Sequence, residues 1–299
     1  TFERISAFNL LNWIAHRHGF GTYFHYIKGM LSQESREQSV KDVERVIKMT
    51  NAANAGIYAS SIISPSFTTA VAQIIQVPGV SGMDNNGLIL EFPRDEIKDE
   101  VTLAQLQTGV KMALSSEFNV CVMRSSEFNC GYKSSIHLWL TRQQLSNANL
   151  MILLAYIIMG HPDWKNSEIS VYAAMPEREL QSQKESLGEL IHKGRVPISS
   201  SNVQVLPFPT TTSYEALVHE YSSEADLVIL GFTPQQFNRW GYRVFTRFPK
   251  LRDVVFVRAE EDEISLLELE GDVAVDEHEL NAQKLETMKP ASGNETTPA

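Results

Sequence analysis

The stretch SPSFTTAVAQIIQVPGVSGMDNNGLILEF, residues Ser64 to Phe92, contains a helix pattern, a glycine-rich loop and a strand pattern in that order. Apolar residues recur at helical spacing from Ala70 to Ile75. We expect Ser64 to cap this helix, because the next residue is proline, which the first helical position tolerates. Pro78 should end the helix. The apolar run Leu88 to Leu90 is typical of a buried strand.

The order of these elements argues against a phosphate-binding loop. Phosphate loops run from a strand through the glycines into a helix, so that free helix N–H groups face the anion. Here the helix leads into the loop with its carboxyl end, and we interpret the glycines as a structural turn. The segment Gly79 to Gly82 also lacks the later glycine of a nucleophile elbow, so we predict no serine nucleophile there.

Composition places the chain among ordinary globular proteins. It has 299 residues, of which 43% are hydrophobic and 21% are charged, which suits one large domain or two smaller ones. The net charge of −10 comes from residues 259–299, which hold twelve acidic residues and two lysines. The first 258 residues contain 24 basic and 24 acidic residues. This balance gives no electrostatic signature of nucleic-acid binding, and we expect no DNA or RNA partner.

Cysteine and histidine residues give no metal pattern. The nine-residue spacing of Cys121 and Cys130 fits neither a zinc site nor a redox pair, so we expect two reduced thiols in a cytosolic protein. His16, His18 and His25 are close in sequence but have no carboxylate or thiol at ligand spacing. We therefore predict no metal. Because the sequence shows no catalytic motif either, we also predict no cofactor, no catalytic residues and no enzymatic activity.

The sequence shows no targeting or membrane-spanning segment. It begins with Thr1 and no signal peptide is visible, so we expect an excised piece of a longer chain. The longest apolar run, Leu150 to Met159, has ten residues, about half of what a membrane-spanning helix needs. We expect the fragment itself to be soluble. The same run is apolar all round, which predicts a helix covered on more than one side, between two halves of the protein or at a subunit contact.

Strand and helix patterns alternate along the chain, which predicts an α/β fold with largely parallel sheets flanked by helices. The pattern starts again near Ser126, so we predict two α/β halves, residues 22–128 and 129–271. The predicted strands after the opening stretch are Asn119 to Met123, Ile136 to Leu140, Ile169 to Ala174, Val203 to Phe208, Asp226 to Phe232, Val254 to Arg258 and Ile264 to Leu269. The other predicted helices run from Ser39 to near Gly56, and over Leu103 to Ser115, Glu179 to His192, Tyr214 to Ser222 and Gln235 to Phe245. Residues 272–299 are predicted to form an acidic, disordered tail.

An amphipathic helix is predicted within residues 1–21, ahead of strands at Thr22 to Ile27 and Ile57 to Ile63. It either packs on its own domain or acts as a connector that docks on the upstream chain or on a partner. Exposed apolar positions on it would then be the dimer face. The residues of this possible connector or partner face are Phe2, Ile5, Phe8, Leu11, Trp13 and Ile14.

Three further segments, together with Ser64 to Phe92, occur in the order found in a known family. They are Tyr23 to Gly29 before a charged helix, Ile136-His137-Leu138-Trp139-Leu140 leading into Leu150 to Ile158, and Asp163-Trp164-Lys165 before the strand Glu168 to Tyr172. In this co-linear order, residues 10–270 resemble the carboxy-terminal cytosolic domain of the cation-chloride cotransporter family, which includes the Na-K-Cl and K-Cl cotransporters.

The resemblance implies a fold similar to the universal stress proteins, doubled into two halves. It also implies a non-enzymatic role in regulation, homodimerisation and trafficking of a symporter that moves Na⁺ or K⁺ together with Cl⁻. The domain would lie at the cytoplasmic face of the membrane, joined through residues 1–21 to the transporter's membrane domain. Animal members carry a long phosphorylated insertion in the second half, whereas Gln181 to Ser201 is compact here.

An alternative function is that of a stand-alone, universal-stress-like protein that binds a nucleotide at the carboxyl ends of its strands. The place to examine is the loop after Asp226 to Phe232, where a strand is followed by a helix. This loop contains Gly231, and the next glycine is Gly241. Stress proteins that bind ATP have a longer glycine run there, so the sequence favours the regulatory domain.

Overall fold

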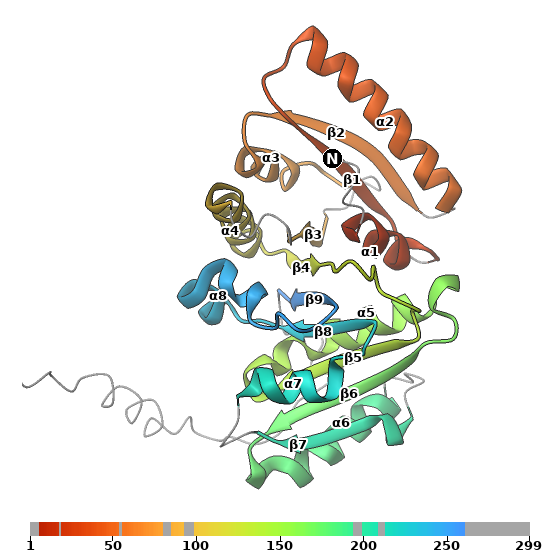
Figure 1. Ribbon diagram of the computed structural model, residues 1–299, viewed down its shortest axis with the longest axis vertical. Coiled ribbons are helices and arrows are strands. Elements are labelled where there is room, and N and C mark those ends of the chain that lie inside the picture. Colours follow the sequence, from red (N-terminus) through yellow and green to blue (C-terminus); the bar gives the residue numbers. More distant parts are fainter. Residues whose placement is uncertain are drawn as a thin grey trace, which may run out of the picture. The chain divides into compact units, whose positions relative to one another are not determined.

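The computed structural model describes residues 6–17, 19–53, 56–79, 85–92, 99–193, 199–208 and 213–260. In these ranges the chain forms a two-stranded sheet, β1-β2, and a seven-stranded sheet of order β3-β4-β9-β8-β5-β6-β7 (Figure 1). All paired strands are parallel except β4 and β9. The predicted α/β fold with a largely parallel sheet and flanking helices is confirmed.

The small sheet is a strand–helix–strand unit. Strands β1 (Gly21–Lys28) and β2 (Ile57–Ser64) pair along their full length, and helix α2 (Gln33–Ala53) connects and packs on them. Helix α2 begins six residues before the predicted start at Ser39. The hydroxyls of Ser32 and Ser35 each accept the backbone N–H of the other residue, which stabilises this earlier start.

The strands of the large sheet alternate with helices along the chain. These strands are β3 (Gly87–Glu91), β4 (Asn119–Arg124), β5 (Ser135–Thr141), β6 (Glu168–Met175), β7 (Val203–Pro207), β8 (Leu227–Gly231) and β9 (Asp253–Arg258). The remaining α-helices are α1 (Ser6–Ala15), α3 (Phe67–Ile74), α4 (Glu100–Ser115), α5 (Ala148–Met159), α6 (Leu180–Lys193), α7 (Tyr214–Ser222) and α8 (Pro234–Trp240). Every residue of β8 is buried, as expected for a strand covered on both faces.

The opening stretch folds as helix, loop and strand, with two changes at the helix. The cap is Ser66 and not Ser64, because β2 continues through Ser64. Ser66 and Thr69 form a reciprocal capping box. The helix α3 ends at Ile74, before Pro78, and the predicted strand is confirmed as β3.

Helix α8 also ends earlier than predicted. It stops at Trp240, and a 3-10 helix (Gly241–Thr246) takes the place of the last predicted α-helical turns. Gly241 has a φ of 57°, which favours glycine. A Cβ at Gly241 would lie 2.3 Å from Oε1 of Gln107 on α4, so the turn also needs glycine for space.

The two predicted halves share one sheet. The antiparallel pairing of β4 with β9 joins strands from before and after the predicted boundary at 128/129. Side chains of both halves also share one apolar core, in which the ring of Phe92 lies 5.8 Å from that of Phe245. The described residues, 6 to 260 with their gaps, accordingly form one compact unit. The predicted strand Ile264 to Leu269 and the tail 272–299 lie outside the described residues.

Helix α5 is covered on two sides, as predicted. It packs on β5, β6 and β8 and also contacts α1. Leu153 and Tyr156 remain exposed on it. Across the part of the chain that the structure describes, no helix combines the length and apolar character needed to cross a membrane.

Candidate functional site: the docking of helix α1 and the loop between β4 and β5

Helix α1 carries most of the predicted connector face, and it contacts three parts of the fold. Phe8 and Ala15 join an apolar cluster with Val46 of α2 and Ile57 of β2. The ring of Phe8 lies 5.5 Å from that of Tyr23 on β1, in an edge-to-face arrangement. These contacts attach α1 to the strand–helix–strand unit.

The second contact of α1 is with the turn between α5 and β6. Trp13 is 3% exposed, and its ring lies 5.2 Å from that of Trp164. The indole Nε1 of Trp13 donates to Oδ2 of Asp163 at 3.4 Å. Lys133 donates to the same oxygen at 3.2 Å and lies over the Trp13 ring. Burial opposes ionisation of Asp163, but Lys133, His161 and Trp13 together lower its pKa.

The third contact involves the first turn of α1. The backbone N–H of Ala7 donates to Oε2 of Glu91 at the end of β3, at 3.2 Å. A carboxylate at this place is favoured by the helix dipole and satisfies one of the free N–H groups. Burial, followed by the charge of Glu91, raises the pKa of Tyr23. Helix α1 therefore ties β3, the small sheet and the α5–β6 turn together.

The docking of α1 buries some residues of the predicted face and leaves others half-buried. Phe8 and Trp13 are buried against the chain's own residues, and Leu11 and Ile14 are half-buried. Phe2 and Ile5 lie outside the described residues. The role of α1 as a connector or partner face stays a prediction. Sequence reasoning found Trp13 and the Asp163-Trp164 turn separately, but no local pattern indicated that they meet.

Two histidines meet at the carboxyl end of α1. The rings of His16 and His161 lie 4.6 Å apart, and His161 Nδ1 accepts the backbone N–H of Asp163. Burial lowers the pKa of His161, with Asp163 acting in the opposite direction and His16 and Lys133 in the same direction. Nε2 of His25 instead lies 3.5 Å from Oδ2 of Asp42. Among the described residues no three His, Cys, Asp or Glu side chains are grouped so that they could hold a metal ion.

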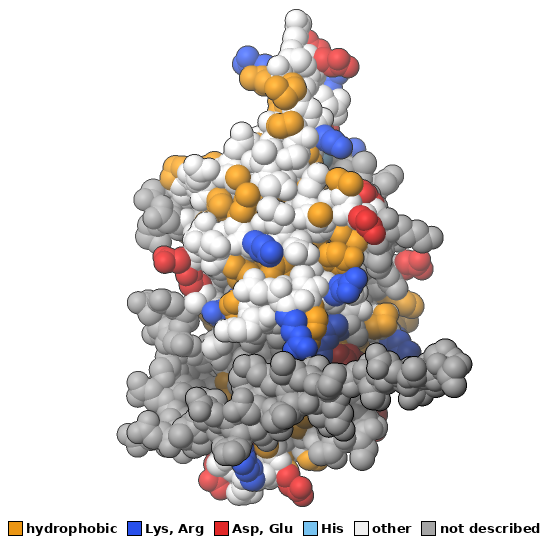
Figure 2. All heavy atoms as spheres, turned by 90° about the vertical axis from the view of Figure 1, so that its left-hand side faces the viewer, with side chains coloured by type: hydrophobic (Ala, Val, Ile, Leu, Met, Phe, Trp, Pro, Cys, Tyr) orange, Lys and Arg blue, Asp and Glu red, His pale blue; other side chains and the backbone are white. Residues whose placement is uncertain are grey.

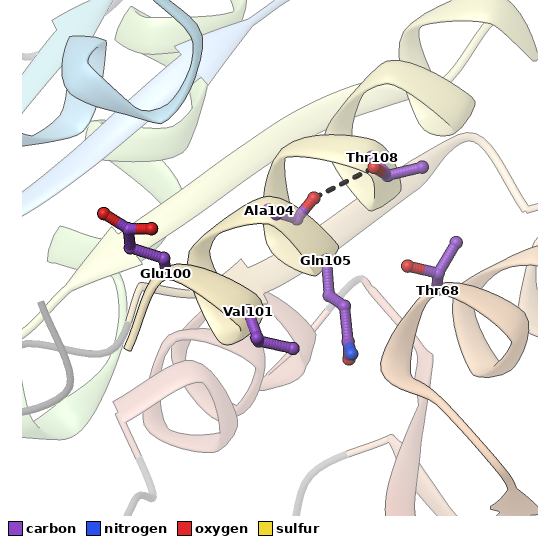
Figure 3. Close-up of a pocket in the computed structure, with 6 residues that line it drawn as sticks. All are labelled: Thr68, Glu100, Val101, Ala104, Gln105 and Thr108. Carbon is purple, nitrogen blue, oxygen red and sulfur yellow. Dashed lines mark hydrogen bonds between the residues drawn. The ribbon is translucent and has the colours of Figure 1, made fainter. Parts of the chain in front are cut away.

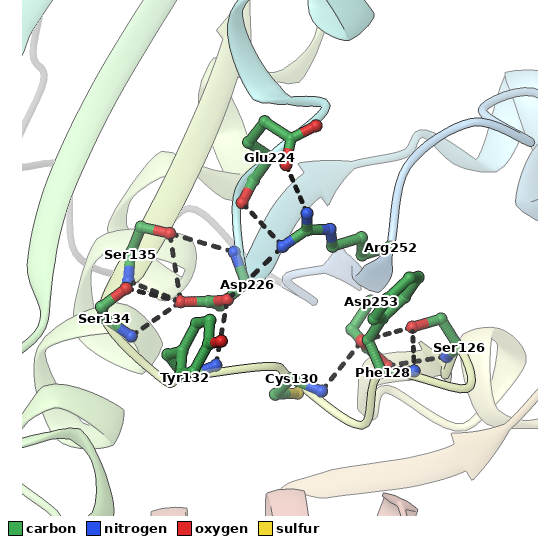
Figure 4. A network of polar contacts seen from close by, with 10 residues as sticks. All are labelled: Ser126, Phe128, Cys130, Tyr132, Ser134, Ser135, Glu224, Asp226, Arg252 and Asp253. Atoms are coloured by element: carbon green, nitrogen blue, oxygen red, sulfur yellow. Dashed lines mark hydrogen bonds and ion pairs between the residues drawn. The ribbon is translucent and has the colours of Figure 1, made fainter.

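Two buried carboxylates hold the loop between β4 and β5 (Figure 4). Asp253, at the start of β9, accepts the N–H and O–H of Ser126 and the N–H of Cys130, all at 2.7–2.9 Å. Asp226, just before β8, accepts the N–H and O–H of Ser134 at 2.8 Å. Burial opposes ionisation of Asp226, but these hydrogen bonds dominate and lower its pKa.

The loop needs these bonds because its backbone is strained. Asn129, Cys130 and Lys133 have φ between 45° and 59°, a backbone conformation that residues other than glycine rarely adopt. Gly131 has a φ of 46°, and a Cβ there would lie 2.3 Å from Asp226 Oδ1. The two carboxylates therefore fix the segment in which the predicted boundary falls. Sequence reasoning missed both, because isolated Asp residues before strands carry no distinctive signal.

The thiols near this loop are structural. Burial raises the pKa of Cys121 to about 12. Burial also raises the pKa of Cys130, and the charge of Asp253 acts in the same direction. Both side chains are buried. Neither thiol is poised to form the thiolate that nucleophilic chemistry requires.

The carboxyl ends of β5 and β8 form the switch point of the sheet, where the alternative function would place a nucleotide. Side chains of the chain itself take up backbone hydrogen-bonding groups at this point. Nδ2 of Asn147 donates to the carbonyl of Phe232, and Oδ1 of Asn147 accepts the N–H of Ala259. The N–H groups of Thr233 and Gln236, which could face a phosphate, are taken by each other's side chains. The prediction that the chain has no cofactor stays a prediction.

A shallow depression of about 340 Å³ lies between α3 and α4 (Figure 3). Two of its polar side chains are engaged in the fold. Gln105 Oε1 accepts the N–H of Phe67, and the Thr108 hydroxyl donates to the carbonyl of Ala104. We assign no ligand to this depression.

Comparison with solved structures identifies similar folds. The chain is similar to the cytoplasmic domain of a prokaryotic cation chloride cotransporter, with a TM-score of 0.60 and 17% identity over 89% of this chain and 94% of that one. A Pseudomonas aeruginosa protein of unknown function gives a TM-score of 0.46 at 13% identity, covering 83% of this chain and 94% of that one. A candidate universal stress protein from Pseudomonas aeruginosa gives a TM-score of 0.49 at 13% identity, covering 82% of this chain and 94% of that one.

The first of these similarities, with a TM-score of 0.60, shows that the two chains share a fold. No family model matches the chain, and no curated protein matches it either.

Proposed function

We propose that this chain is the cytosolic regulatory and dimerisation domain of a cation-chloride cotransporter. It acts without catalysis of its own on the transport activity or trafficking of a membrane domain joined at its amino end. The fold similarity to the cytoplasmic domain of a prokaryotic cotransporter supports this proposal, as does the resemblance in the order of sequence segments.

The observation that carries the proposal is the position of α1. The first described helix contacts the small sheet, β3 and the α5–β6 turn at once. Packed protein interiors transmit displacements because they have few voids. A membrane domain attached ahead of α1 would therefore act on the whole fold through this helix, and the fold would act on the membrane domain in return.

The reading frame upstream of this chain provides the first test. The proposal predicts about a dozen apolar segments of about 20 residues each, the length that spans a bilayer. A frame that encodes a soluble protein ahead of residue 1 would contradict the proposal.

A further inference from the structure

Basic residues are concentrated in one segment of the chain. Residues 227–252 contain five Lys or Arg and no Asp or Glu, although the first 258 residues are balanced in charge. The carboxylates at either end, Asp226 and Asp253, are buried and hold the loop between β4 and β5. The segment from Arg239 to Lys250 therefore has a positive field that its own sequence does not neutralise.

An aromatic ring lies within this basic segment. The guanidinium groups of Arg239 and Arg247 lie 5.5 and 4.8 Å from the centre of the Trp240 ring. The Trp240 side chain remains 37% exposed. Cation–π contacts of this kind keep the guanidinium groups and the indole together at the surface.

Most of these charges have no counter-charge in the described ranges. Arg247 pairs with Glu215 of α7 at 2.5 Å. Arg239, Arg243 and Lys250 are exposed, and no carboxylate of the described residues lies within ion-pair distance of them. Figure 2 shows Lys and Arg side chains gathered on the side of the fold where α4 and α8 lie.

The carboxyl-terminal part of the segment reaches the strand ends at which α1 begins. Strands β3 and β4 are parallel, and their carboxyl ends meet the start of β9 because β4 and β9 are antiparallel. Glu91, at the end of β3, holds the first turn of α1. At the end of β4, Arg124 donates to the carbonyls of Phe245 and Phe248 in the basic segment. The stretch from Phe245 to Phe248 and the first turn of α1 are thus held at neighbouring strand ends, those of β4 and β3.

We propose that the segment Arg239 to Lys250 is a membrane-contact surface that binds anionic phospholipid headgroups. The proposal rests on the proposed function, under which the residues ahead of α1 lead to the bilayer. Clustered Lys and Arg side chains are attracted to anionic leaflets, and indole rings favour the membrane interface. This contact would hold the domain in one orientation beneath the transporter.

Vesicle co-sedimentation of the purified chain tests the proposal. We expect the chain to bind vesicles of phosphatidylcholine with phosphatidylglycerol, not those of phosphatidylcholine alone, and to bind more weakly as salt rises. The double variant Arg239→Ala/Arg243→Ala should bind about thirtyfold more weakly, because each basic residue near an anionic surface contributes about fivefold. The matched control is Lys41→Ala/Lys48→Ala, two exposed basic residues on α2, which should bind like the unaltered chain.

Three results would overturn the proposal: no binding to anionic vesicles, equal binding to neutral ones, or equal losses in the two double variants. Binding of a polyglutamate peptide in place of vesicles, abolished by Arg239→Ala/Arg243→Ala, would instead indicate an acidic protein partner. Melting temperatures of the variants check that they fold. The assay does not depend on the upstream reading frame, so its failure can be distinguished from failure of the proposed function.

Discussion

Trp13 shows at the scale of one residue how the first helix is held. Its ring packs on Trp164, and its Nε1 shares the Asp163 carboxylate with Lys133. Replacing a buried tryptophan with alanine typically destabilises a protein by about 3–5 kcal/mol, because it removes apolar contacts and leaves a cavity.

We therefore expect Trp13→Ala to lower the free energy of unfolding by about 3–5 kcal/mol in urea denaturation. Leu31, which is 77% exposed, supplies the control: Leu31→Ala should change the free energy of unfolding by less than about 0.5 kcal/mol. Equal stability of the two variants would show that α1 is not docked as described.

Asp226 makes the stability of the fold depend on pH. Its folded-state pKa is lowered, so its stabilising effect is fully present above its ordinary pKa and is lost as the pH falls through the folded value. We expect Asp226→Asn to destabilise the chain by about 2–3 kcal/mol at neutral pH, because its charge-assisted hydrogen bonds are weakened. The difference from the unaltered chain should shrink below about pH 4.

Unfolding at a series of pH values measures this difference. Glu127→Gln, at an exposed position of the same loop, is the control and should differ little from the unaltered chain at any pH. A deficit in Asp226→Asn that persists undiminished in acid would mean that the carboxylate charge does not hold the loop.

At the scale of the element, replacing two glycines with alanine should change the stability of the chain in opposite directions. At Gly241 the positive φ and the proximity of Gln107 both oppose a side chain, so Gly241→Ala should destabilise the chain by more than about 1 kcal/mol. At Gly188 in α6 a Cβ would meet nothing within 4 Å, and Gly188→Ala should stabilise the helix by about 0.5–1 kcal/mol. Thermal melts measure both changes, and a stabilising Gly241→Ala would contradict the described end of α8.

The elements differ in how far the sequence predicts them. Strands such as β8 and helices such as α7 follow from local apolar spacing, and their positions were predicted closely. The ends of helices depend on contacts made elsewhere. The early start of α2 depends on the Ser32–Ser35 pair, and the end of α8 depends on Gln107 of another helix.

The candidate site was predicted less completely for the same reason. Apolar spacing identified an amphipathic helix with Phe8 on its apolar face and Trp13 flanking that face, but what these two residues pack on follows from the fold. The pairing of β4 with β9, which joins residues more than a hundred positions apart, likewise leaves no periodic signal in either strand.

Self-association is a prediction for the whole molecule. Leu153 is 50% exposed on α5, and the exposed Tyr156 lies three residues further along the same helix face. Interface cores are enriched in aromatic residues and depleted in charged ones, so we predict that this face contributes to a dimer contact. We expect sedimentation velocity to show dimers that form as concentration rises, and Leu153→Asp to weaken them at least tenfold. Val101→Asp, at an exposed apolar position on α4, is the control and should leave the dimer intact. A strict monomer at high micromolar concentration would contradict a dimer formed through this domain.

The most direct test of the proposed regulatory role uses the full-length protein in lipid vesicles. Uptake of radioactive Na⁺ or Rb⁺ is measured with and without chloride, for the unaltered protein, for Asp163→Ala, which weakens the docking of α1, and for Glu34→Ala, an exposed control on α2. We predict chloride-dependent cation uptake whose rate, at equal protein in the membrane, is altered by Asp163→Ala and unchanged by Glu34→Ala. Absence of chloride-dependent uptake, or identical rates in all three proteins, would contradict the account.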